Sequence, residues 1–237
     1  MSLLVCTATG KELSALAPDL FPDPDVLREY TPMLKEGGRE NLIFLVSGIG
    51  PINAALALGF CLGLKFSVEN DPIRAILYAG LAGAFDLERD PLQSIRIVRK
   101  EIWPEYGLHD GNSVTARAFR FPLWERKEGD DIYDSIDLAG VEVLGAKTPR
   151  DWQECTSITV AGVSASFARR DKLWTDWHAQ LENMEGFAAA YAALRAEIPC
   201  VELRVVSNKV GPRGRHEKDF GGALATMGKL LSALKLL

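Results

Sequence analysis

The chain lacks the cysteine and histidine patterns that hold metal ions or cross-link small secreted domains. Its four cysteines are scattered without CxxC spacing, and its three histidines lie far apart with no HExxH pairing. Zinc sites and disulfide frameworks both depend on such spacings, so the sequence favours neither. We therefore expect no metal and no cofactor, and cysteines that behave as small hydrophobic residues.

Runs of positive charge and long hydrophobic runs are also missing. The formal net charge is -5 with a pI near 5.4, and no Lys/Arg stripe offers the footprint of a phosphate-backbone binder. The longest apolar stretch, residues 54–64, is shorter than the ~20 residues of a membrane span. The first residues show neither the charged region nor the cleavage site of a secretory leader. We expect no nucleic-acid partner, no membrane span and a cytoplasmic location.

What the chain does contain is ordinary globular composition arranged in alternating strand and helix patterns. Of its 237 residues, 47% are hydrophobic and 25% are charged. Short apolar runs predict strands at 3–8, 42–46, 75–80, 95–98, 141–145, 157–163 and 200–207. Longer periodic segments predict helices near 10–17, 51–65, 170–180, 184–196 and 221–236. The pattern predicts one α/β domain over residues 1–237, with a mixed, mainly parallel central sheet flanked by helices.

Glycine-rich or polar turns follow several of the predicted strands, where ligands of open α/β sheets gather. These turns are "TATGKE", "SGIGPINAA", "GLAGAF" and "SNKVGPRGR". None has the GxGxxG spacing of a dinucleotide site, and the chain has no GxxxxGK[ST] run. Two of these turns, "SGIGPINAA" and "GLAGAF", are rich in glycine. Taken alone, each is explained by tight strand-to-helix packing at least as well as by ligand binding.

Several polar residues near these turns also allow a purely structural interpretation. Glu12 completes a T-x-x-E capping box with Thr9, and Glu185 stands where a helix begins and its dipole favours negative charge. Asn208 suits a left-handed turn after a strand. Arg204 alternates with apolar neighbours, so it is either exposed on a sheet edge or buried with a carboxylate partner.

The order of the motifs along the chain resembles the purine nucleoside phosphorylase and nucleosidase superfamily. The resemblance rests on "TGKE", "VSGIGPINAA", "YAGLAGAF", "NMEGFAAAYA" and "VELRVVSNKVG", in that order. Within the superfamily the chain is most similar to the futalosine hydrolases, which carry SN where methylthioadenosine/S-adenosylhomocysteine nucleosidases carry SD. The segment "EYGLHDG" is similar to the same branch. Residues 18–40 and 112–140 match no family motif.

The resemblance implies a site that cleaves an N-glycosidic bond through an oxocarbenium-like transition state. Glu12 would activate the attacking water, a role typically worth ~10² to 10⁴ in rate. Glu185 would accept hydrogen bonds from the ribose hydroxyls, above Met184 as an apolar floor. Phe167 would stack on the purine, and Arg204 would hold Glu12 ionised.

The resemblance further implies how the leaving base is held. Because an amide cannot deliver a proton, Asn208 would donate hydrogen bonds to N7 and O6 of hypoxanthine. An Asn side chain can equally pair with N6 and N7 of adenine, along the same edge of the purine. Ala82, Gly83 and Ser207 are further expected substrate contacts. Water is the expected nucleophile, because "TATGKE" replaces the GDPxR-type phosphate loop of related phosphorylases. Leu81 stands where many nucleosidases have a hydroxyl residue.

The expected reaction is therefore hydrolysis of futalosine, a purine nucleoside, to hypoxanthine and dehypoxanthine futalosine on the futalosine route to menaquinone. The alternatives are an adenine-nucleoside nucleosidase acting on methylthioadenosine, S-adenosylhomocysteine or aminodeoxyfutalosine, an inosine-type phosphorylase, and a non-catalytic purine-nucleoside binding protein. Relatives form homo-oligomers in which one chain closes the neighbour's site. Tyr106 and His109, in the segment 103–111, are the expected contacts to the substrate's tail, and Arg169, Arg170, Arg213, Arg215 and His216 are further candidates.

Overall fold

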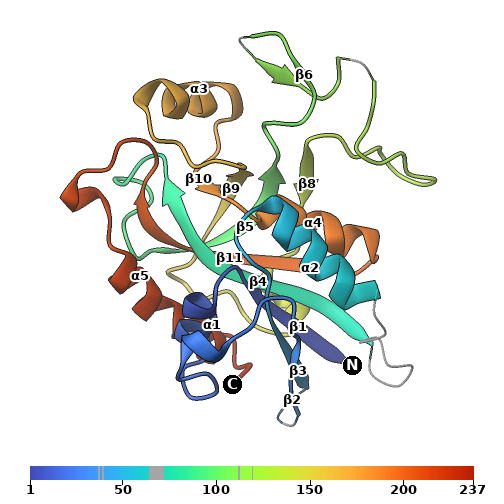
Figure 1. Ribbon diagram of the computed structural model, residues 1–237, viewed down its shortest axis with the longest axis vertical. Coiled ribbons are helices and arrows are strands. Elements are labelled where there is room, and N and C mark those ends of the chain that lie inside the picture. Colours follow the sequence, from blue (N-terminus) through green and yellow to red (C-terminus); the bar gives the residue numbers. More distant parts are fainter. Residues whose placement is uncertain (37, 39, 64–71, 112, 119) are drawn as a thin grey trace.

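The computed structural model describes residues 1–36, 38, 40–63, 72–111, 113–118 and 120–237 (Figure 1). Among them, a nine-stranded sheet has the order β10-β9-β5-β11-β4-β1-β3-β2, with β8 paired to β5. Its strands are β1 (Ser2–Thr7), β2 (Met33–Lys35), β3 (Asn41–Val46), β4 (Ile73–Ala84), β5 (Ile95–Ile102), β8 (Ser135–Asp137), β9 (Gln153–Thr159), β10 (Leu181–Asn183) and β11 (Cys200–Lys209). The predicted α/β class with a mixed sheet is confirmed.

Parallel pairing dominates the middle of the sheet. The neighbours β3, β1, β4 and β11 all run parallel, and so do β5, β9 and β10. The two groups meet antiparallel where β11 pairs with β5. Buried strands such as Ser2–Thr7 read as continuous apolar runs because both of their faces are covered.

The sheet curls back on itself around the long strand β4. The strand β10 pairs in parallel with β9 and also antiparallel with the end of β4, so that β4, β11, β5, β9 and β10 form a closed ring. This closure brings Leu181 and Glu182 next to Ala84 and Gly83. Segments that are about a hundred positions apart in the chain thereby share one end of the sheet.

Helices cover both faces of the sheet. On one face lie α1 (Gly10–Leu16), α5 (Phe220–Met227) and α6 (Leu230–Ala233), whose apolar side chains join one core cluster with β1 and β3. On the other face α2 (Pro51–Gly63) lies beside α4 (Gly186–Arg195), and their Ala and Leu side chains pack in a second cluster. The remaining helix, α3 (Phe167–Trp177), packs Leu173 into a third, smaller cluster.

Most of the predicted elements are present, with shifted ends. The strand predicted at 75–80 is twelve residues long, and the helix predicted at 221–236 is divided into α5 and α6. The helix predicted at 51–65 is described as far as Gly63, and residues 64 and 65 lie outside the described part of the chain. The strand β10 was not predicted, because a run of three residues carries too little periodicity to be recognised.

The strand predicted at 141–145 is wrong. Residues Val141–Leu144 form a short 3₁₀ helix that ends at Gly145 with a left-handed φ of 71°. Val141 and Leu144 are both buried in the core. In so short a stretch, the alternation of apolar and polar residues in "VEVLG" does not distinguish a strand from a single helical turn.

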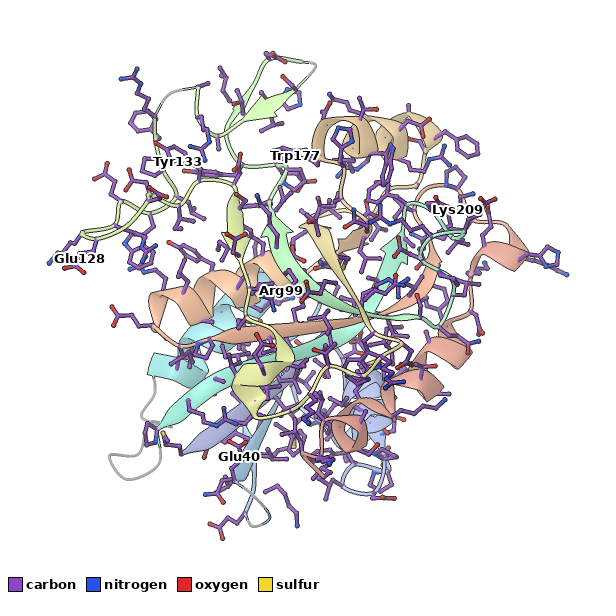
Figure 2. All side chains as sticks on the ribbon, turned by 180° about the vertical axis from the view of Figure 1, so that it is seen from behind. Glu40, Arg99, Glu128, Tyr133, Trp177 and Lys209 are labelled. Atoms are coloured by element: carbon purple, nitrogen blue, oxygen red, sulfur yellow. The ribbon has the colours of Figure 1, made fainter. Side chains whose placement is uncertain are left out.

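Two polar segments, 18–40 and 103–138, leave the sheet and return to it. Within 18–40 are the short helix Pro24–Val26 and the edge strand β2. Within 103–138 are the hairpin β6 (Leu108–His109) and β7 (Val114–Thr115) and then β8. Figure 2 shows this second segment, with Glu128 and Tyr133, projecting away from the sheet. Across the described ranges, no helix has both the length and the apolar character needed to cross a bilayer.

Candidate active site

A cavity of about 480 Å³ opens at the carboxyl ends of β1, β4 and β11, beside β10. Its walls combine the glycine turns with the ends of these strands. Of the residues predicted for the site, seven line the cavity: Glu12, Ala82, Gly83, Met184, Glu185, Ser207 and Asn208. It is also lined by Ala8, Thr9, Lys11, Ile49, Leu81, Val163, Glu182, Asn183, Arg213, Phe220 and Leu224.

Glu12 is both a helix cap and a cavity residue. Its Oε2 accepts hydrogen bonds from the Thr9 backbone N and Oγ1, both at 2.9 Å, and the Glu12 N donates back to Thr9 Oγ1 at 3.2 Å. Its other oxygen, Oε1, accepts from the backbone N of Leu81 at 3.0 Å. The capping box and the catalytic interpretation are thus compatible, because each uses a different carboxylate oxygen.

The surroundings of Glu12 make its carboxylate more basic. Burial raises the pKa of Glu12, and the neighbouring Glu185 raises it further. The hydrogen bonds from Leu81 and Thr9 and the charge of Arg204 act in the opposite direction but do not cancel the rise. A raised carboxyl pKa brings the group closer to the range in which a general base works best.

The carboxylate of Glu185 contacts residues outside the helix that begins next to it. It occupies the N-cap position of α4, but its side chain makes no capping hydrogen bond there. Its Oε1 accepts from the backbone N of Gly50 at 3.0 Å, and Oε2 lies 3.5 Å from Nη1 of Arg204. Gly50 has a φ of 93°, a left-handed conformation that favours glycine. The "SGIGP" turn therefore presents an N–H to a carboxylate 135 positions later in the chain.

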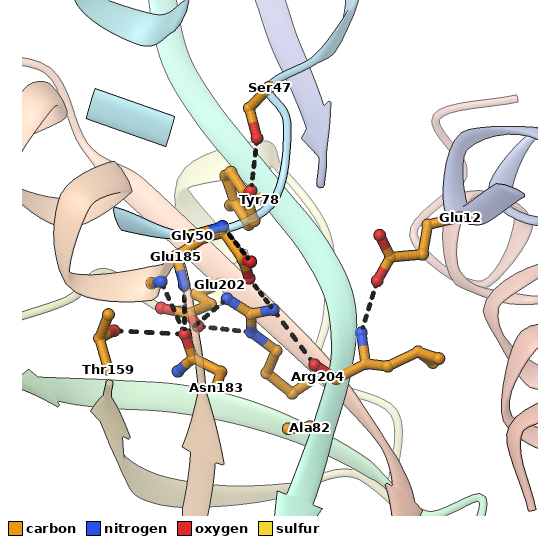
Figure 3. Close-up of polar contacts among 12 residues, drawn as sticks. Glu12, Ser47, Gly50, Tyr78, Ala82, Thr159, Asn183, Glu185, Glu202 and Arg204 are labelled. Carbon is orange, nitrogen blue, oxygen red and sulfur yellow. Dashed lines mark hydrogen bonds and ion pairs between the residues drawn. The ribbon is translucent and has the colours of Figure 1, made fainter. Parts of the chain in front are cut away.

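Arg204 is fully buried beneath the cavity, so it is not exposed on a sheet edge. Its Nε donates to Glu202 Oε1 at 2.7 Å, Nη2 donates to Asn183 Oδ1 at 3.1 Å and Nη1 donates to the Leu81 carbonyl at 3.3 Å (Figure 3). Burial alone would lower its pKa, but the negative charges of Glu202 and Glu185 outweigh burial and raise it. Arg204 therefore stays protonated and holds Glu185 and the β4 backbone in place.

Gly80 allows Arg204 and Glu12 to approach the same point of β4. A Cβ at Gly80 would lie 2.7 Å from Nη1 of Arg204 and 3.2 Å from Oε1 of Glu12. A Cβ this close would push the Arg204 guanidinium away from its hydrogen bonds to Glu202 and Asn183, so glycine is the residue that fits without moving Arg204. The first glycine of "YAGLAG" is thus explained by the close packing of Arg204 and Glu12 around it.

A polar network that the sequence did not indicate supports Arg204 from below. Asn183 Oδ1 accepts from the backbone N of Glu185 and of Gly186, at 2.9 and 2.7 Å, and so caps α4. Its Nδ2 donates to Glu101 Oε1 at 2.6 Å. Glu101 and Glu202 are both fully buried, and burial followed by the proximity of Glu202 raises the pKa of Glu101 well above its usual range. The sequence feature that could have revealed this network is a carboxylate within an apolar strand, Glu202 in "VELRV".

Asn208 lies in β11 and not in a left-handed turn, which begins only at Gly211 with a φ of 98°. A register shift between Val206 and Asn208 places a β-bulge at the cavity, a device that re-aims side chains. The Asn208 Oδ1 accepts from Ser207 Oγ at 3.0 Å, and Nδ2 donates to the Lys209 carbonyl at 2.8 Å. The amide nitrogen is the atom nearest to the space above Gly83.

Besides Arg204, which lies beneath the cavity, Phe167, Tyr106 and His109 do not line it. Phe167 begins α3 with 59% of its surface exposed, and the Arg170 guanidinium lies 4.9 Å from the centre of its ring. Tyr106 stacks on Trp103, and its hydroxyl donates to the Phe121 carbonyl at 3.1 Å. His109 lines a separate hollow of about 530 Å³ against α3. Lys11 and Arg213 line the main cavity instead, and of these only Arg213 was among the tail candidates.

The described residues contain no group of three or more His, Cys, Asp or Glu side chains that could hold a metal ion. The four cysteines are free and buried, and burial raises the pKa values of their thiols. The charged groups at the cavity are carboxylates, one guanidinium beneath them, and Lys11 and Arg213 on the wall. This arrangement suits proton abstraction from water and stabilisation of a cationic sugar.

Comparison with known proteins agrees with this geometry. The family model of the Phosphorylase superfamily matches residues 128–236. The chain is 31% identical to the futalosine hydrolase of Streptomyces coelicolor over 99% of this chain and 97% of that protein. It is 29% identical to the futalosine hydrolase of Thermus thermophilus over 81% of this chain and 80% of that protein.

Among solved structures, a futalosine hydrolase mutant of Helicobacter pylori superposes with a TM-score of 0.71 at 16% identity, covering 99% of this chain and 98% of that one. At 16% identity the superposition shows the fold alone, and the family is shown by the sequence relatives. The chain belongs to the futalosine hydrolase family of the phosphorylase superfamily.

Proposed function

We propose that the chain hydrolyses the N-glycosidic bond of futalosine, releasing hypoxanthine and dehypoxanthine futalosine. One observation carries the proposal: a single cavity is lined by two carboxylates, Glu12 and Glu185, and by an amide, Asn208. The identity to a futalosine hydrolase over nearly the whole chain supports the same reaction. Residues 1–237 act in this proposal as one nucleosidase-like domain.

Glu12 takes the proton of the attacking water as the bond to the base breaks. The base leaves with the electron pair of that bond as an anion and then takes up a proton from solvent, and Glu12 returns its own proton to solvent. The hydrogen bonds from Thr9 and Leu81 hold its carboxylate on two sides, so it is pre-oriented toward the cavity. Where relatives offer a hydroxyl side chain, Leu81 here contributes its backbone N–H to Glu12. The raised pKa of Glu12 makes it a stronger base than an exposed carboxylate.

Glu185 binds the ribose 2′- and 3′-hydroxyls and lies close to the positive charge that develops on the sugar. Gly50 and Arg204 fix its carboxylate, and charge-assisted hydrogen bonds from hydroxyl groups are stronger than neutral ones. Met184, on the same turn, forms the apolar floor beneath the sugar. Arg204 acts through Glu185 and the Leu81 carbonyl and does not line the cavity.

Asn208 receives the leaving base. Its Oδ1 accepts from Ser207 and one hydrogen of its Nδ2 goes to the Lys209 carbonyl, so the other Nδ2 hydrogen is the donor for N7 or O6 of hypoxanthine. Water rather than phosphate is the nucleophile, because Glu12 would repel an anion at the place where the related phosphorylases bind one. Phe167 reaches the base only if the start of α3 moves inward.

The substrate's tail ends in a benzoate, and the cations of the cavity wall are its partners in this proposal. Lys11 and Arg213 line the cavity, and Nε of Arg213 is buried and has no hydrogen-bond partner within the described residues. Tyr106 and His109 contribute only if a second copy of the chain brings them to the neighbour's cavity. We propose such a homo-oligomer, located in the cytoplasm and acting on the futalosine route to menaquinone.

A substrate panel tests the proposal. Purified protein is given futalosine, aminodeoxyfutalosine, methylthioadenosine or inosine, each with and without phosphate, and the free base is followed by chromatography. The expected result is phosphate-independent release of hypoxanthine from futalosine. Preferential release of adenine, or a requirement for phosphate, would replace the proposal by the nucleosidase or phosphorylase reaction. No release from any substrate, despite binding, would leave a nucleoside-binding protein.

A further inference from the structure

A second carboxylate of the cavity, Glu182, has no part in the reaction as described above. It lies in β10, between Leu181, which packs in the core, and Asn183, which belongs to the Arg204 network. Side chains alternate along a strand, so Glu182 points away from both of these neighbours. It is 4% exposed and lines the cavity. A buried carboxylate at the wall of a binding site requires hydrogen-bond donors.

Part of that requirement is met by one residue. The backbone N of Ser164 donates to Glu182 Oε1 at 3.0 Å, and Ser164 Oγ donates to Oε2 at 2.5 Å. A carboxylate has about four acceptor sites, so each oxygen retains capacity for another donor. Ser164 also anchors the loop that carries the cavity residue Val163, which gives Glu182 one structural role.

The closed ring of strands places Glu182 opposite Asn208. Both residues are in register with Gly83, Glu182 across the antiparallel β10–β4 pair and Asn208 across the parallel β11–β4 pair. Their strands therefore flank β4 two strand spacings apart, roughly 10 Å. Gly83 has no side chain, which lets Asn208 Nδ2 and Val210 Cγ2 approach to 2.9 and 3.1 Å from the place that a Cβ would take there. Glu182, Gly83 and Asn208 all line the cavity, so a flat base bound there is within reach of both side chains.

The two side chains offer opposite hydrogen-bonding character. The Lys209 carbonyl takes one hydrogen of Asn208 Nδ2 and Ser207 Oγ donates to its oxygen, so the second Nδ2 hydrogen is a donor left for the base, whereas Glu182 presents only acceptors. A 6-oxopurine has acceptors at N7 and O6 and a donor at N1–H. A 6-aminopurine has a lone pair at N1, which would face the lone pairs of Glu182. The pattern of donor and acceptors across Gly83 matches the 6-oxopurine.

We propose that Glu182 accepts the N1–H hydrogen bond of the 6-oxopurine and thereby selects against 6-aminopurines. The inference rests on the proposed function, since it assumes that the base binds between Glu182 and Asn208. It assigns base selectivity to a pair of residues, whereas Asn208 by itself can pair with either purine. Sites built around a substrate N–H discriminate strongly, because an unmatched analogue leaves the buried polar group unpaired.

The decisive variant is Glu182→Gln. Ser164 N–H still requires an acceptor, so the Gln carbonyl oxygen takes that position and the amide NH₂ is left near N1 of the base. We expect kcat/KM for futalosine to fall roughly ten- to a hundredfold, as for loss of a hydrogen bond to a charged group. For aminodeoxyfutalosine we expect kcat/KM to stay within about threefold or to rise, because its N1 accepts.

Ser164→Ala is the matched control. It removes the hydroxyl that anchors Glu182 but keeps the carboxylate, so kcat/KM should fall by similar factors for both substrates. A Glu182→Gln variant that lowers kcat/KM equally for both substrates would overturn the inference, and Glu182 would be only a loop anchor.

Two binding measurements keep the inference testable without turnover, and the first of them needs no variant. Calorimetry on the unaltered protein should show weaker binding of N1-methylhypoxanthine than of hypoxanthine, and equal affinities would overturn the inference. If the unaltered protein releases no hypoxanthine from futalosine, the proposed function fails while the base affinities still decide about Glu182. In that case, loss of hypoxanthine affinity but not adenine affinity in Glu182→Gln would uphold it.

Discussion

Glu12 shows how one side chain can serve local structure and chemistry together. Its Oε2 closes the capping box with Thr9, and its Oε1 is held by Leu81 from the neighbouring strand β4. A cap of this type contributes about 1 kcal/mol to the stability of a helix. The sequence motif therefore predicted the cap correctly but could not show that the second oxygen belongs to the cavity.

Replacing Glu12 by Gln separates these two functions. Gln also completes a capping box, but its NH₂ then faces the Leu81 N–H, so the free energy of unfolding should fall by about 1 to 3 kcal/mol. Because an amide cannot take a proton from water, kcat should fall about 10²- to 10⁴-fold, while the Kd for hypoxanthine stays within a few-fold. Single-turnover rates and calorimetry on the same preparation measure both. Unchanged turnover would reduce Glu12 to a cap.

Glu101 should make the stability of the protein depend on pH. Burial and the nearby Glu202 raise its pKa well above the usual value, so the folded state holds a proton that the unfolded state releases. Stability from this group is complete below the unfolded carboxyl pKa and is lost as pH rises toward the folded pKa. Glu12 and Glu202, whose pKa values are also raised, act in the same direction.

The variant Glu101→Gln isolates this contribution. The amide resembles the protonated acid, and Thr159 Oγ1 still finds an acceptor in its carbonyl oxygen. Between pH 5 and pH 8, the decrease in the free energy of unfolding should be smaller in Glu101→Gln than in the unaltered protein. Denaturant titrations at both pH values provide the comparison, and equal decreases would show that Glu101 does not hold the proton.

Among the helices, α4 has the most constrained beginning. It starts at Gly186, where a Cβ would collide with the carboxylates of both Glu101 and Glu202. Asn183, not Glu185, caps the helix, which leaves Glu185 to bind Gly50 and Arg204. The Ala-rich sequence of α4 lets it pack closely on α2 and on the sheet.

Gly186→Ala should therefore destabilise the protein despite the higher helix propensity of Ala. Overpacking of a filled interior costs typically 1 to 3 kcal/mol, and displacement of the Glu101–Glu202 pair adds to that cost. The matched control is Gly59→Ala in α2, where the Cβ meets no atom within 4 Å and about 0.5 to 1 kcal/mol of stabilisation is expected. Thermal unfolding of both variants measures the contrast. A stabilised Gly186→Ala would contradict the crowding.

The secondary structure was predictable where it depends on local pattern. Continuous apolar runs located β1, β3 and β11, and the T-x-x-E motif located the start of α1. The prediction failed at Val141–Leu144, where four residues are too few to distinguish a strand from a helical turn. It also missed β10, whose place in the sheet depends on pairing with two distant strands.

The outer face of α2 bears on the assembly of the whole molecule. Ile52, Leu56 and Phe60 follow one another at helical spacing and are 80%, 60% and 51% exposed. Beside them an apolar hollow of about 240 Å³ is lined by residues that include Trp103, Phe187 and Tyr191. A contiguous exposed apolar surface of this kind is typical of an interface between protein chains.

If the proposed homo-oligomer forms through this face, sedimentation should show a species larger than 26.0 kDa. The variant Ile52→Lys should shift the protein toward the monomer, because an interface excludes an unpaired charge. Val26→Lys, at an exposed apolar residue beside α1 on the opposite face of the sheet, is the matched control and should leave the assembly unchanged. A monomeric, fully active protein would remove Tyr106 and His109 from the site.

The order of short motifs was enough to assign the fold class and the family, since each motif is a local pattern of residues. It also pointed to seven residues that line one cavity. The partners of those residues were not predictable: Gly50 binds Glu185 across 135 positions, and Leu81 binds Glu12 across 69. Such contacts, like the approach of Glu182 to Gly83, arise when the sheet closes on itself. They depend on strand register and burial, which are properties of the packed chain and are not encoded in any local stretch of sequence.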